Sequence, residues 1–269
     1  MAAPPVLELV GVVKRFNRVT VADRVSFSVA EGEVVGVVGP NGAGKTSLFG
    51  VISGDLRADA GEIILAGTPL KRLDAADRCR LGIGRTYQVP RAFERMSVFE
   101  NVLVAAHQGA GLRGRGATDF AADVLAETGL LDAANRPAGA LGLLPRKRLE
   151  LAKALATKPR ILLLDEVAGG LTDPEVDQLV AIVQRARASG TSVIWIEHVL
   201  RAIVNTVDRL ICLAAGHIVG DGKPTEVLAM AEVKELFLGA VPGDDTVVQG
   251  AARRSADAGG DRHLREESG

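Results

Sequence analysis

The chain has 269 residues, of which 47% are hydrophobic and 24% charged, and its formal net charge is -1. This length suffices for one α/β domain, or for a domain with a small lobe. The near-neutral charge argues against a general nucleic-acid binder, which needs a basic surface. Cys79 and Cys212 lie far apart in no metal-ligand spacing, which favours a reduced, cytosolic setting.

The sequence contains no candidate for a membrane-spanning segment. No apolar run reaches the roughly 20 residues that cross a bilayer. The N-terminal stretch MAAPPVLELV lacks the positive and apolar regions of a secretory signal. We therefore expect that this chain is not itself a channel and that any link to a membrane runs through a partner.

The first part of the chain predicts strands around a glycine-rich turn. Residues 6–13 and 25–29 read as strands. Residues 34–38 (VVGVV) form a short β-branched run, which is typical of a strand buried on both faces in a parallel sheet. Residues 46–54 (TSLFGVISG) then repeat apolar residues at helical spacing and end at Gly54. A phosphate-binding loop requires this order of strand, glycine loop and helix.

The middle of the chain changes in character. Residues 61–65 predict another strand. From about 92 to 150, two long helical patterns are separated by GAGLRGRG, which predicts a helical lobe with a flexible loop, inserted into the α/β core. Residues 161–166 and 191–197 again read as short buried strands.

The last part of the chain predicts a capped helix, a hairpin and a tail. Asp173 is expected to cap a helix whose first residue is Pro174. Residues 209–213 and 217–219, joined by AAG, predict a hairpin. Apolar periodicity then fades, and we predict a disordered tail over 243–269.

Residues 39–46 (GPNGAGKT) fit the phosphate-loop pattern G-x-x-x-x-G-K-[ST]. The glycines let backbone N–H groups close around phosphate oxygens, where a Cβ would hold the backbone away. Lys45 supplies positive charge for the β- and γ-phosphates, Thr46 supplies a hydroxyl for Mg²⁺, and the following helix points its positive end at the anion. The candidate nucleotide-binding residues of this loop are Gly39, Pro40, Asn41, Gly42, Ala43, Gly44, Lys45, Thr46 and Ser47.

Two carboxylates follow the apolar run at 161–164. Buried strands of an open α/β sheet deliver functional groups at their carboxyl ends. We expect Asp165 to hold Mg²⁺, through water, and Glu166 to polarise the attacking water as a general base, a role worth about 10²–10⁴-fold in rate.

The ordered set GPNGAGKT, RTYQ, LELAKAL, ILLLDE and IEHV resembles the ATP-binding cassette (ABC) ATPases over residues of about 6 to 240. The resemblance implies an α/β fold over 1–242. Its P-loop NTPase core is a mostly parallel sheet flanked by helices, with an N-terminal antiparallel β lobe and an inserted helical lobe. It also implies ATP hydrolysis, with ATP and Mg²⁺ as the cofactors.

The resemblance assigns roles to four further residues. Phe16 matches the aromatic residue that stacks on adenine. Gln88 matches the glutamine that senses Mg²⁺ and the γ-phosphate and relays to the membrane partner, and it is a candidate both for catalysis and for the metal. His198 matches the histidine that hydrogen-bonds the γ-phosphate, and Thr172 sits at the polar D-loop position. Without this context, Phe16 reads as a core residue and Thr172 as a residue flanking a helix.

The sequence departs from the family at residues 141–145. ABC ATPases carry an LSGGQ-type segment there, and each nucleotide lies between one chain's phosphate loop and the other chain's segment. Here the segment reads LGLLP: Gly142 lacks a hydroxyl, Leu144 is bulky, and Pro145 has no N–H. One hypothesis is a pair with a different ATPase chain, in which the site completed by 142–145 hydrolyses slowly or only binds. The alternative is that both sites work.

Three sequence segments are most similar to the ATPase subunits of branched-chain or hydrophobic amino-acid importers: GRTYQVPRAFERMSVFENVLVAAH, ELAKALATKPRILLLDE and VAGGLTDPEV. This resemblance implies a second ATPase chain, transmembrane permease subunits and, indirectly, a substrate-binding protein as partners. It implies a cytoplasmic position, peripheral on the inner face of the cell membrane. Residues 89–100 are expected to contact a transmembrane helix end, or else to form a solvated helix.

Several functions other than amino-acid import are compatible with parts of the sequence. Cargo such as urea, a related amide or another small solute stays open, as does a binding-only pseudo-ATPase, although Glu166 and His198 count against the latter. A regulatory GTPase would need an [NT]-K-x-D segment, and a chromosome-type ABC protein would need long heptad coiled coils. The sequence contains neither.

Overall fold

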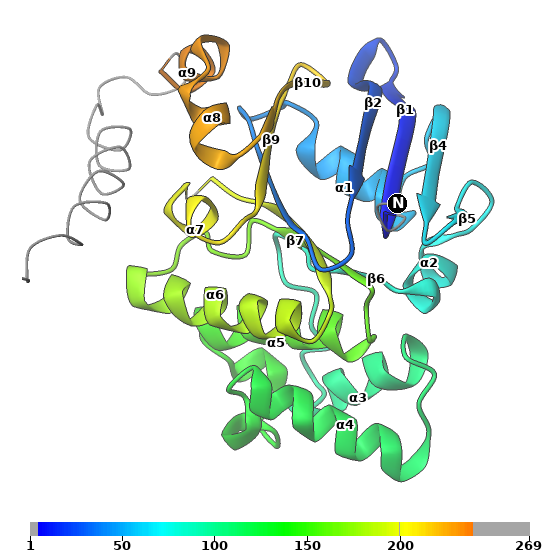
Figure 1. The fold of residues 1–269 in the computed structure, drawn as a ribbon. Helices are drawn as coiled ribbons and strands as arrows, with labels where there is room; N and C mark the ends of the chain where they lie inside the picture. Colours follow the sequence, from blue (N-terminus) through cyan, green and yellow to red (C-terminus); the bar gives the residue numbers. More distant parts are fainter. Residues whose placement is uncertain (1–4, 199, 239–269) are drawn as a thin grey trace, which may run out of the picture.

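Two β-sheets and the helices around them make up the described residues, 5–198 and 200–238 of the computed structural model (Figure 1). The antiparallel sheet and the parallel sheet lie together in the upper part of Figure 1, and helices α3 and α4 lie below them. Every helix in these residues is too short or too polar to span a bilayer. The tail predicted for 243–269 lies outside the described residues.

The larger sheet has six strands in the order β10-β9-β3-β8-β7-β6, and all neighbours are parallel except β9 and β10. Its strands are β3 (Val34–Val38), β6 (Ile83–Arg85), β7 (Ile161–Asp165), β8 (Ser192–Ile196), β9 (Arg209–Ala214) and β10 (His217–Gly222). Every residue of β3, β7 and β8 is buried. The short apolar runs therefore correctly predicted the buried centre of a parallel sheet, and the hairpin prediction is also confirmed.

The smaller sheet is antiparallel, in the order β2-β1-β4-β5. Its strands are β1 (Leu7–Phe16), β2 (Val19–Val29), β4 (Ala60–Leu65) and β5 (Thr68–Pro69). Strands β1 and β2 are longer than the sequence predicted, because their pairing continues to Phe16 and Val19 through several register shifts. These shifts break the two-residue alternation by which the ends of the strands could have been recognised.

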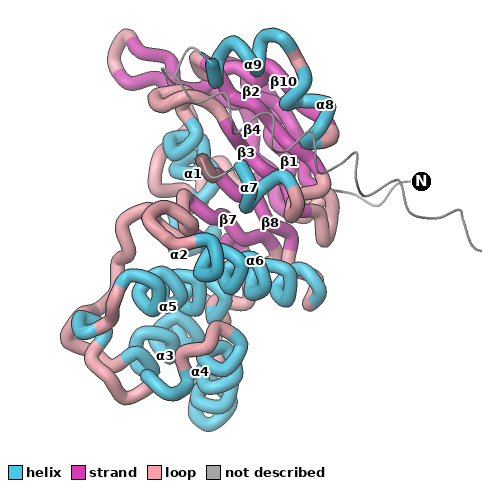
Figure 2. Tube along the Cα trace, turned by 90° about the vertical axis from the view of Figure 1, so that its left-hand side faces the viewer, coloured by secondary structure: helices cyan, strands magenta, loops and turns pink. Residues whose placement is uncertain are grey.

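Three helices form the lobe between β6 and β7, as predicted: α3 (Val98–Gln108), α4 (Gly114–Glu127) and α5 (Leu143–Ala156), with short 3₁₀ turns η1 (Leu131–Ala133) and η2 (Ala138–Ala140). Figure 2 shows them packed together at one end of the molecule. One face of α5 (Leu149, Ala152) packs into the lobe, and another (Leu151, Ala154) packs against the sheet. The lobe and the core therefore share α5.

Two details of the helices differ from the sequence prediction. The stretch predicted as a flexible loop supplies the first turn of α4, since Gly114 and its two successors are helical. The other helices are α1 (Lys45–Ser53), α2 (Ala75–Leu81), α6 (Asp173–Ala188), α7 (Leu200–Val204), α8 (Pro224–Ala229) and α9 (Ala231–Leu238). Helix α6 begins one residue earlier than expected, at Asp173. Its cap is Thr172, which shares a capping box with Glu175.

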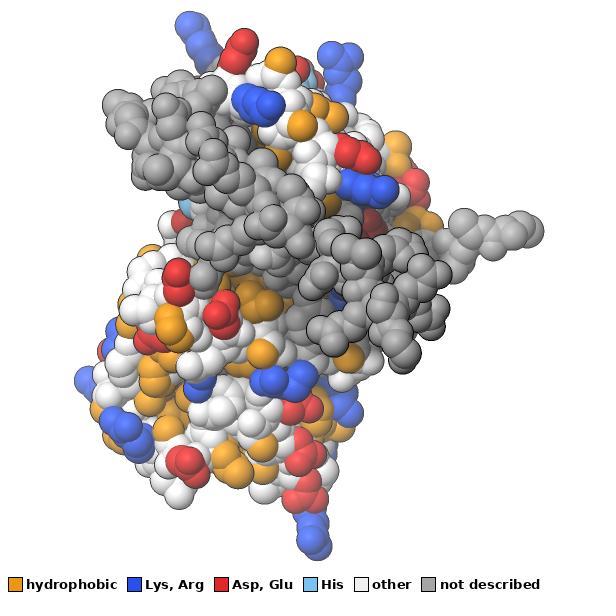
Figure 3. All heavy atoms as spheres, turned by 60° about the vertical axis from the view of Figure 1, so that its left-hand side comes forward, with side chains coloured by type: hydrophobic (Ala, Val, Ile, Leu, Met, Phe, Trp, Pro, Cys, Tyr) orange, Lys and Arg blue, Asp and Glu red, His pale blue; other side chains and the backbone are white. Residues whose placement is uncertain are grey.

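Basic and acidic side chains are interspersed on the face drawn in Figure 3, where no large patch of one sign forms among the coloured atoms. Such a mixed surface agrees with the formal net charge of -1. The coloured atoms of this view, which belong to the described residues, form no basic stripe of the kind that nucleic-acid binding requires.

Candidate functional site

The phosphate-loop motif joins buried strand β3 to helix α1, as predicted. Two of its glycines are required by close backbone contacts. A Cβ on Gly39 would lie 2.0 Å from the Leu213 carbonyl oxygen, and a Cβ on Gly44 would lie 1.9 Å from that of Val21. Both residues also have positive φ, at 147° and 100°. The loop therefore depends on these glycines for its shape and for its fit against the strands beside it.

Lys45, the first residue of α1, is 5% exposed and folds back over the loop. Its Nζ donates to the carbonyl oxygens of Gly39, at 2.8 Å, and Pro40, at 3.0 Å. Burial lowers the pKa of Lys45, while the charges of Glu166 and Asp165 oppose that shift. The amine is thus held against the backbone of the loop by these two hydrogen bonds.

Asp165 ends β7 directly beneath α1. Its Oδ1 accepts from the Thr46 hydroxyl at 3.4 Å, and its backbone N–H donates to Thr86 Oγ1 at 3.1 Å. The side chain is 1% exposed. Burial raises the pKa of Asp165, and the neighbouring Arg85 guanidinium opposes that shift. The predicted pair Thr46 and Asp165 is therefore brought together by the fold.

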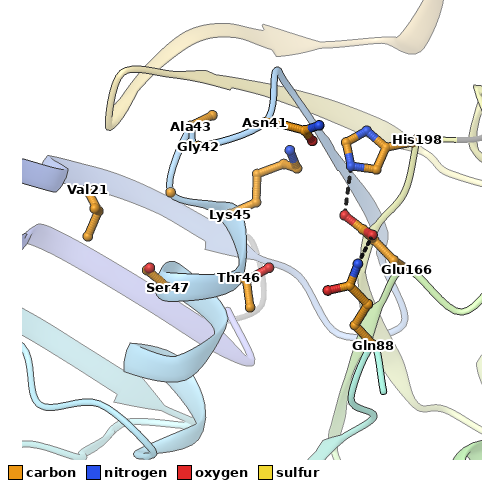
Figure 4. A pocket seen from close by; sticks show the side chains of 11 residues that line it. Val21, Asn41, Gly42, Ala43, Lys45, Thr46, Ser47, Gln88, Glu166 and His198 are labelled. Atoms are coloured by element: carbon orange, nitrogen blue, oxygen red, sulfur yellow. Dashed lines mark hydrogen bonds and ion pairs between the residues drawn. The ribbon is translucent and has the colours of Figure 1, made fainter. Parts of the chain in front are cut away.

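Glu166 lies across the cleft from the phosphate loop, between Gln88 and His198 (Figure 4). Gln88 Nε2 donates to one carboxylate oxygen at 2.5 Å, and His198 Nε2 lies 2.7 Å from the other. The Glu166 backbone has φ of 50°, a left-handed conformation that is rare for a residue with a side chain. Gln88, which lies 78 residues before Glu166, and His198, which lies 32 residues after it, thus meet at its carboxylate.

A cleft of about 570 Å³ lies between these groups and the loop. It is lined by Val21, Asn41, Gly42, Ala43, Gly44, Lys45, Thr46, Ser47, Gln88, Glu166 and His198. Ten of the fourteen predicted site residues therefore line one cavity. Gly39, Pro40 and Asp165 do not line the cleft but are hydrogen-bonded to residues that do. Gly39 and Pro40 accept from Lys45, and Asp165 accepts from Thr46.

Phe16 does not line this cleft either, and among the described residues no side-chain hydrogen bond links it to a lining residue, as one does for Gly39, Pro40 and Asp165; Val21 of β2 lines the cleft instead. Its side chain is 44% exposed, so the core role is wrong for it. Lys14 Nζ lies 5.2 Å from the centre of its ring. The ring is thus partly exposed with Lys14 over it, and its contact with a base stays a prediction.

Sequence reasoning missed Arg85, although it quoted the RTYQ segment that contains it. Arg85 Nη2 lies 3.3 Å from Asp165 Oδ2, and Nη1 lies 2.7 Å from Asp55 Oδ2. Its only signal in the sequence is a charged residue at the end of a short strand, three residues before Gln88. That signal does not predict its partners Asp55 and Asp165, which are 30 and 80 residues away in sequence.

The oxygen atoms at this site suit Mg²⁺, which prefers hard oxygen ligands and keeps several of its waters. Thr46 and Asp165 supply a hydroxyl and a carboxylate side by side. The described part of the chain holds no cluster of three or more His, Cys, Asp or Glu side chains that could enclose an ion alone. The residues therefore fit a metal ion that is shared with phosphate oxygens, and Thr46 and Asp165 are the side chains that would hold it.

Residues 141–145 lie at the start of α5. Gly142 is the N-cap, with no side-chain capping bond, and Pro145 occupies the third helical position. The two leucines differ from expectation: Leu144 packs against the core beside β7, while Leu143 is 52% exposed. The bulky group presented at this helix end is therefore Leu143.

A glycine-rich loop between a buried parallel strand and a helix, with carboxylates at the end of a neighbouring strand, defines a P-loop nucleoside triphosphatase. The family model described as ABC transporter matches residues 22–169, which is more than half of the chain. The chain belongs to this family, and it is an ATP-binding, ATP-hydrolysing subunit of the ABC type.

Named relatives agree with this assignment. The chain is 35% identical over 250 residues to the high-affinity branched-chain amino acid transport ATP-binding protein BraF of Pseudomonas aeruginosa, covering 87% of this chain and 98% of BraF. It is 34% identical, with the same coverage, to LivG of Escherichia coli, which bears the same description. A solved structure, the ADP conformation of an ATP-binding cassette of an ABC transporter, matches with TM-score 0.78 and 28% identity over 88% of this chain and all of that one.

Proposed function

We propose that the chain powers the uptake of branched-chain or other hydrophobic amino acids, as the ATPase subunit of an ABC importer. The convergence of the phosphate loop, Gln88, Glu166 and His198 on one cleft carries the catalytic part of the proposal. Similarity to BraF and LivG over nearly their whole length supports the cargo. Both relatives are described as acting on branched-chain amino acids.

In the proposed site, loop N–H groups and Lys45 hold the β- and γ-phosphates. Thr46 and Asp165 would hold Mg²⁺, with Gln88 as a further candidate, and the ion when bound would neutralise charge on the phosphate oxygens. The low dielectric around the buried Lys45 would strengthen its attraction to the triphosphate. Phe16, on the neighbouring sheet, is assigned to the adenine ring.

Glu166 is the proposed general base. Its carboxylate is already oriented by Gln88 and His198, which approach its two oxygens from opposite sides (Figure 4). A water beside the γ-phosphate would lose its proton to one of these oxygens as it attacks. His198 would donate a hydrogen bond to the γ-phosphate, and Gln88 would offer its amide oxygen Oε1 to the metal ion.

Replacing Glu166 with Gln tests this assignment. The amide keeps the shape of the side chain and removes the base, so ATP turnover should fall about 10²-fold or more while nucleotide affinity is kept. Steady-state phosphate release and binding of a fluorescent ATP analogue measure the two effects. Glu62→Gln, on the antiparallel sheet, is the control. Equal turnover of Glu166→Gln and the unmodified chain would instead support the binding-only pseudo-ATPase.

The partners and place of action are also proposed. A second ATPase chain, transmembrane permease subunits and, indirectly, a substrate-binding protein would complete the importer. The chain would then lie at the cytoplasmic face of the membrane through those subunits. Residues 89–100 would contact the permease, because Val89 and Phe93 are exposed hydrophobic side chains immediately after Gln88.

Reconstitution in vesicles tests the cargo. Co-expressed subunits that co-purify with this chain should show ATP-dependent uptake of leucine, isoleucine and valine. Urea, a small amide, is the competing cargo in the same assay. Uptake of urea without uptake of the three amino acids would replace the proposed cargo and leave the ATPase assignment intact.

A further inference from the structure

Arg85 is buried between two carboxylates that belong to different parts of the site. Its side chain is 9% exposed. Nη2 faces Asp165 Oδ2 at 3.3 Å, while Nη1 donates to Asp55 Oδ2 at 2.7 Å and to Ser53 Oγ at 2.9 Å. A guanidinium presents donors in a fixed planar fork, so it can hold two such partners at a set angle, which a lysine ammonium cannot do.

These contacts fix both oxygens of Asp165. Oδ1 accepts from Thr46 at the beginning of α1, and Oδ2 faces Arg85, which is anchored by Ser53 and Asp55 at the end of the same helix. Asp165 is thus held against α1 at two points. Rotation of its carboxylate would break one contact or the other.

The same guanidinium also contacts the segment that leads to Gln88. Its central carbon lies 4.9 Å from the Tyr87 ring centre, and the Tyr87 hydroxyl lies 3.3 Å from Asp55 Oδ2. Arg91 covers the ring as well, at 4.0 Å. The residue directly before Gln88 is therefore packed against the anchor of Arg85.

We propose that Arg85 is a positioning residue for the metal half of the site: anchored by Asp55, it orients the Asp165 carboxylate so that Oδ1 faces Thr46 and the metal ion. This inference rests on the proposed role of Thr46 and Asp165 in holding Mg²⁺. Groups that orient a metal-holding carboxylate affect metal affinity without touching the ion, and their loss typically weakens binding about 10–100-fold.

Binding of Mn²⁺ in the presence of saturating ADP gives a readout that does not depend on turnover. Free Mn²⁺ is measured by its electron paramagnetic resonance signal as the chain is titrated. Arg85→Gln should raise the apparent Kd for Mn²⁺ about 10-fold. The Kd of Arg85→Lys should lie between that of Arg85→Gln and that of the unmodified chain. ADP affinity measured with EDTA should stay within about twofold, since Arg85 does not line the cleft.

Three variants separate the possible outcomes. Arg80→Gln removes an exposed arginine paired with Asp77 on α2 and should change nothing. Asp55→Asn loosens the anchor and leaves Arg85 in place, so it should shift Mn²⁺ affinity in the same direction as Arg85→Gln. It also serves as the test if Arg85→Gln does not fold. Asp165→Asn tests the metal side chain itself.

Two results would overturn the inference. One is an unchanged Mn²⁺ affinity in Arg85→Gln and Asp55→Asn while Asp165→Asn weakens it. The other is an equal loss of Mn²⁺ affinity and of metal-free ADP affinity, which indicates a structural role only. Unchanged Mn²⁺ affinity in Asp165→Asn would instead contradict the proposed metal site.

Discussion

Burial controls the ionisation of several single residues around the cleft. Lys45 lines the cleft and Asp165 lies beneath Thr46, and burial shifts their pKa values in opposite directions, each toward the neutral form. Each is also near opposite charge, which favours the ionised form. A magnesium triphosphate would supply further charge of the needed sign to both, so the site is electrostatically suited to that ligand.

Cys212 permits a test of burial by pH. Burial raises the pKa of its thiol from 9.0 to about 11, with the charge of Glu232 adding to the rise. In the unfolded chain the thiol ionises at lower pH, so the folded state loses stability as pH rises from 9 toward 11. Between pH 8 and pH 10, Cys212 should reduce the free energy of unfolding by about 1 kcal/mol.

Urea unfolding of the unmodified chain and of Cys212→Ala at both pH values measures this contribution. The difference between the two proteins is needed because Lys45, with its lowered pKa, acts in the opposite direction at alkaline pH. A stability difference that does not change with pH would show that Cys212 ionises normally in the folded state.

The residues of the site differ in how well the sequence predicted them. The phosphate loop was recognised because its residues are contiguous and its glycines are required locally. Glu166 was assigned from its place at the end of a buried strand, Gln88 and His198 from their order in the family pattern, and the fold brings the three together. Arg85 was missed because its function depends on contacts with residues far away in sequence.

At the scale of elements, helix α1 shows which boundaries a sequence can predict. It begins after Gly44 and ends before Gly54, both with positive φ, so the glycines mark its two ends locally. Strands β1 and β2 lack such markers, and their ends are set by pairing with each other across register shifts. The sequence accordingly predicted α1 well and the two strands too short.

Helix α6 provides a test at this scale. The Thr172 hydroxyl and backbone N–H both lie 2.8 Å from Glu175 Oε2. Thr172→Ala removes the hydroxyl from this capping box, so the free energy of unfolding should fall by about 1 kcal/mol. Thr118→Ala, at an exposed helical position, is the control for chemical denaturation.

The same variant separates the two roles considered for Thr172. A cap alone predicts lower stability with an unchanged hydrolysis rate per folded molecule. A contribution from the D-loop position predicts the reverse, a lower rate in the assembled pair with stability little changed. Measurement of both quantities on one preparation distinguishes them.

At the scale of the whole molecule, α5 connects two surfaces. Residues 142–145 form its N-cap and first turn, and two residues further on Lys147 Nζ donates to the Glu166 carbonyl oxygen at 3.4 Å. The predicted segment that faces a second nucleotide is thus part of a helix that also touches this chain's own site. The overall α/β design with a helical lobe was predictable from the sequence, whereas this connection required the structure.

The departure of residues 142–145 from the family pattern leads to the final prediction, which concerns the proposed pair with a different ATPase chain. Gly142 has φ of −68°, and a Cβ placed on it would meet no atom within 4 Å. A serine therefore fits there without strain and restores the missing hydroxyl. Since a preorganised donor is worth about 10²–10³ in rate, even partial recovery should speed the site it faces about 10-fold.

This site can be isolated with Glu166→Gln, which disables the site built on this chain's own phosphate loop. In that background, single-turnover hydrolysis by the reconstituted pair reports on the mirror site alone. Gly142→Ser should be faster than the Glu166→Gln background by about 10-fold, whereas Gly142→Ala, which adds a Cβ without a hydroxyl, should not be. If Ser and Ala gave the same rate, the hydroxyl would not be limiting. If the two sites of the unmodified pair already turned over equally, the asymmetry itself would be refuted.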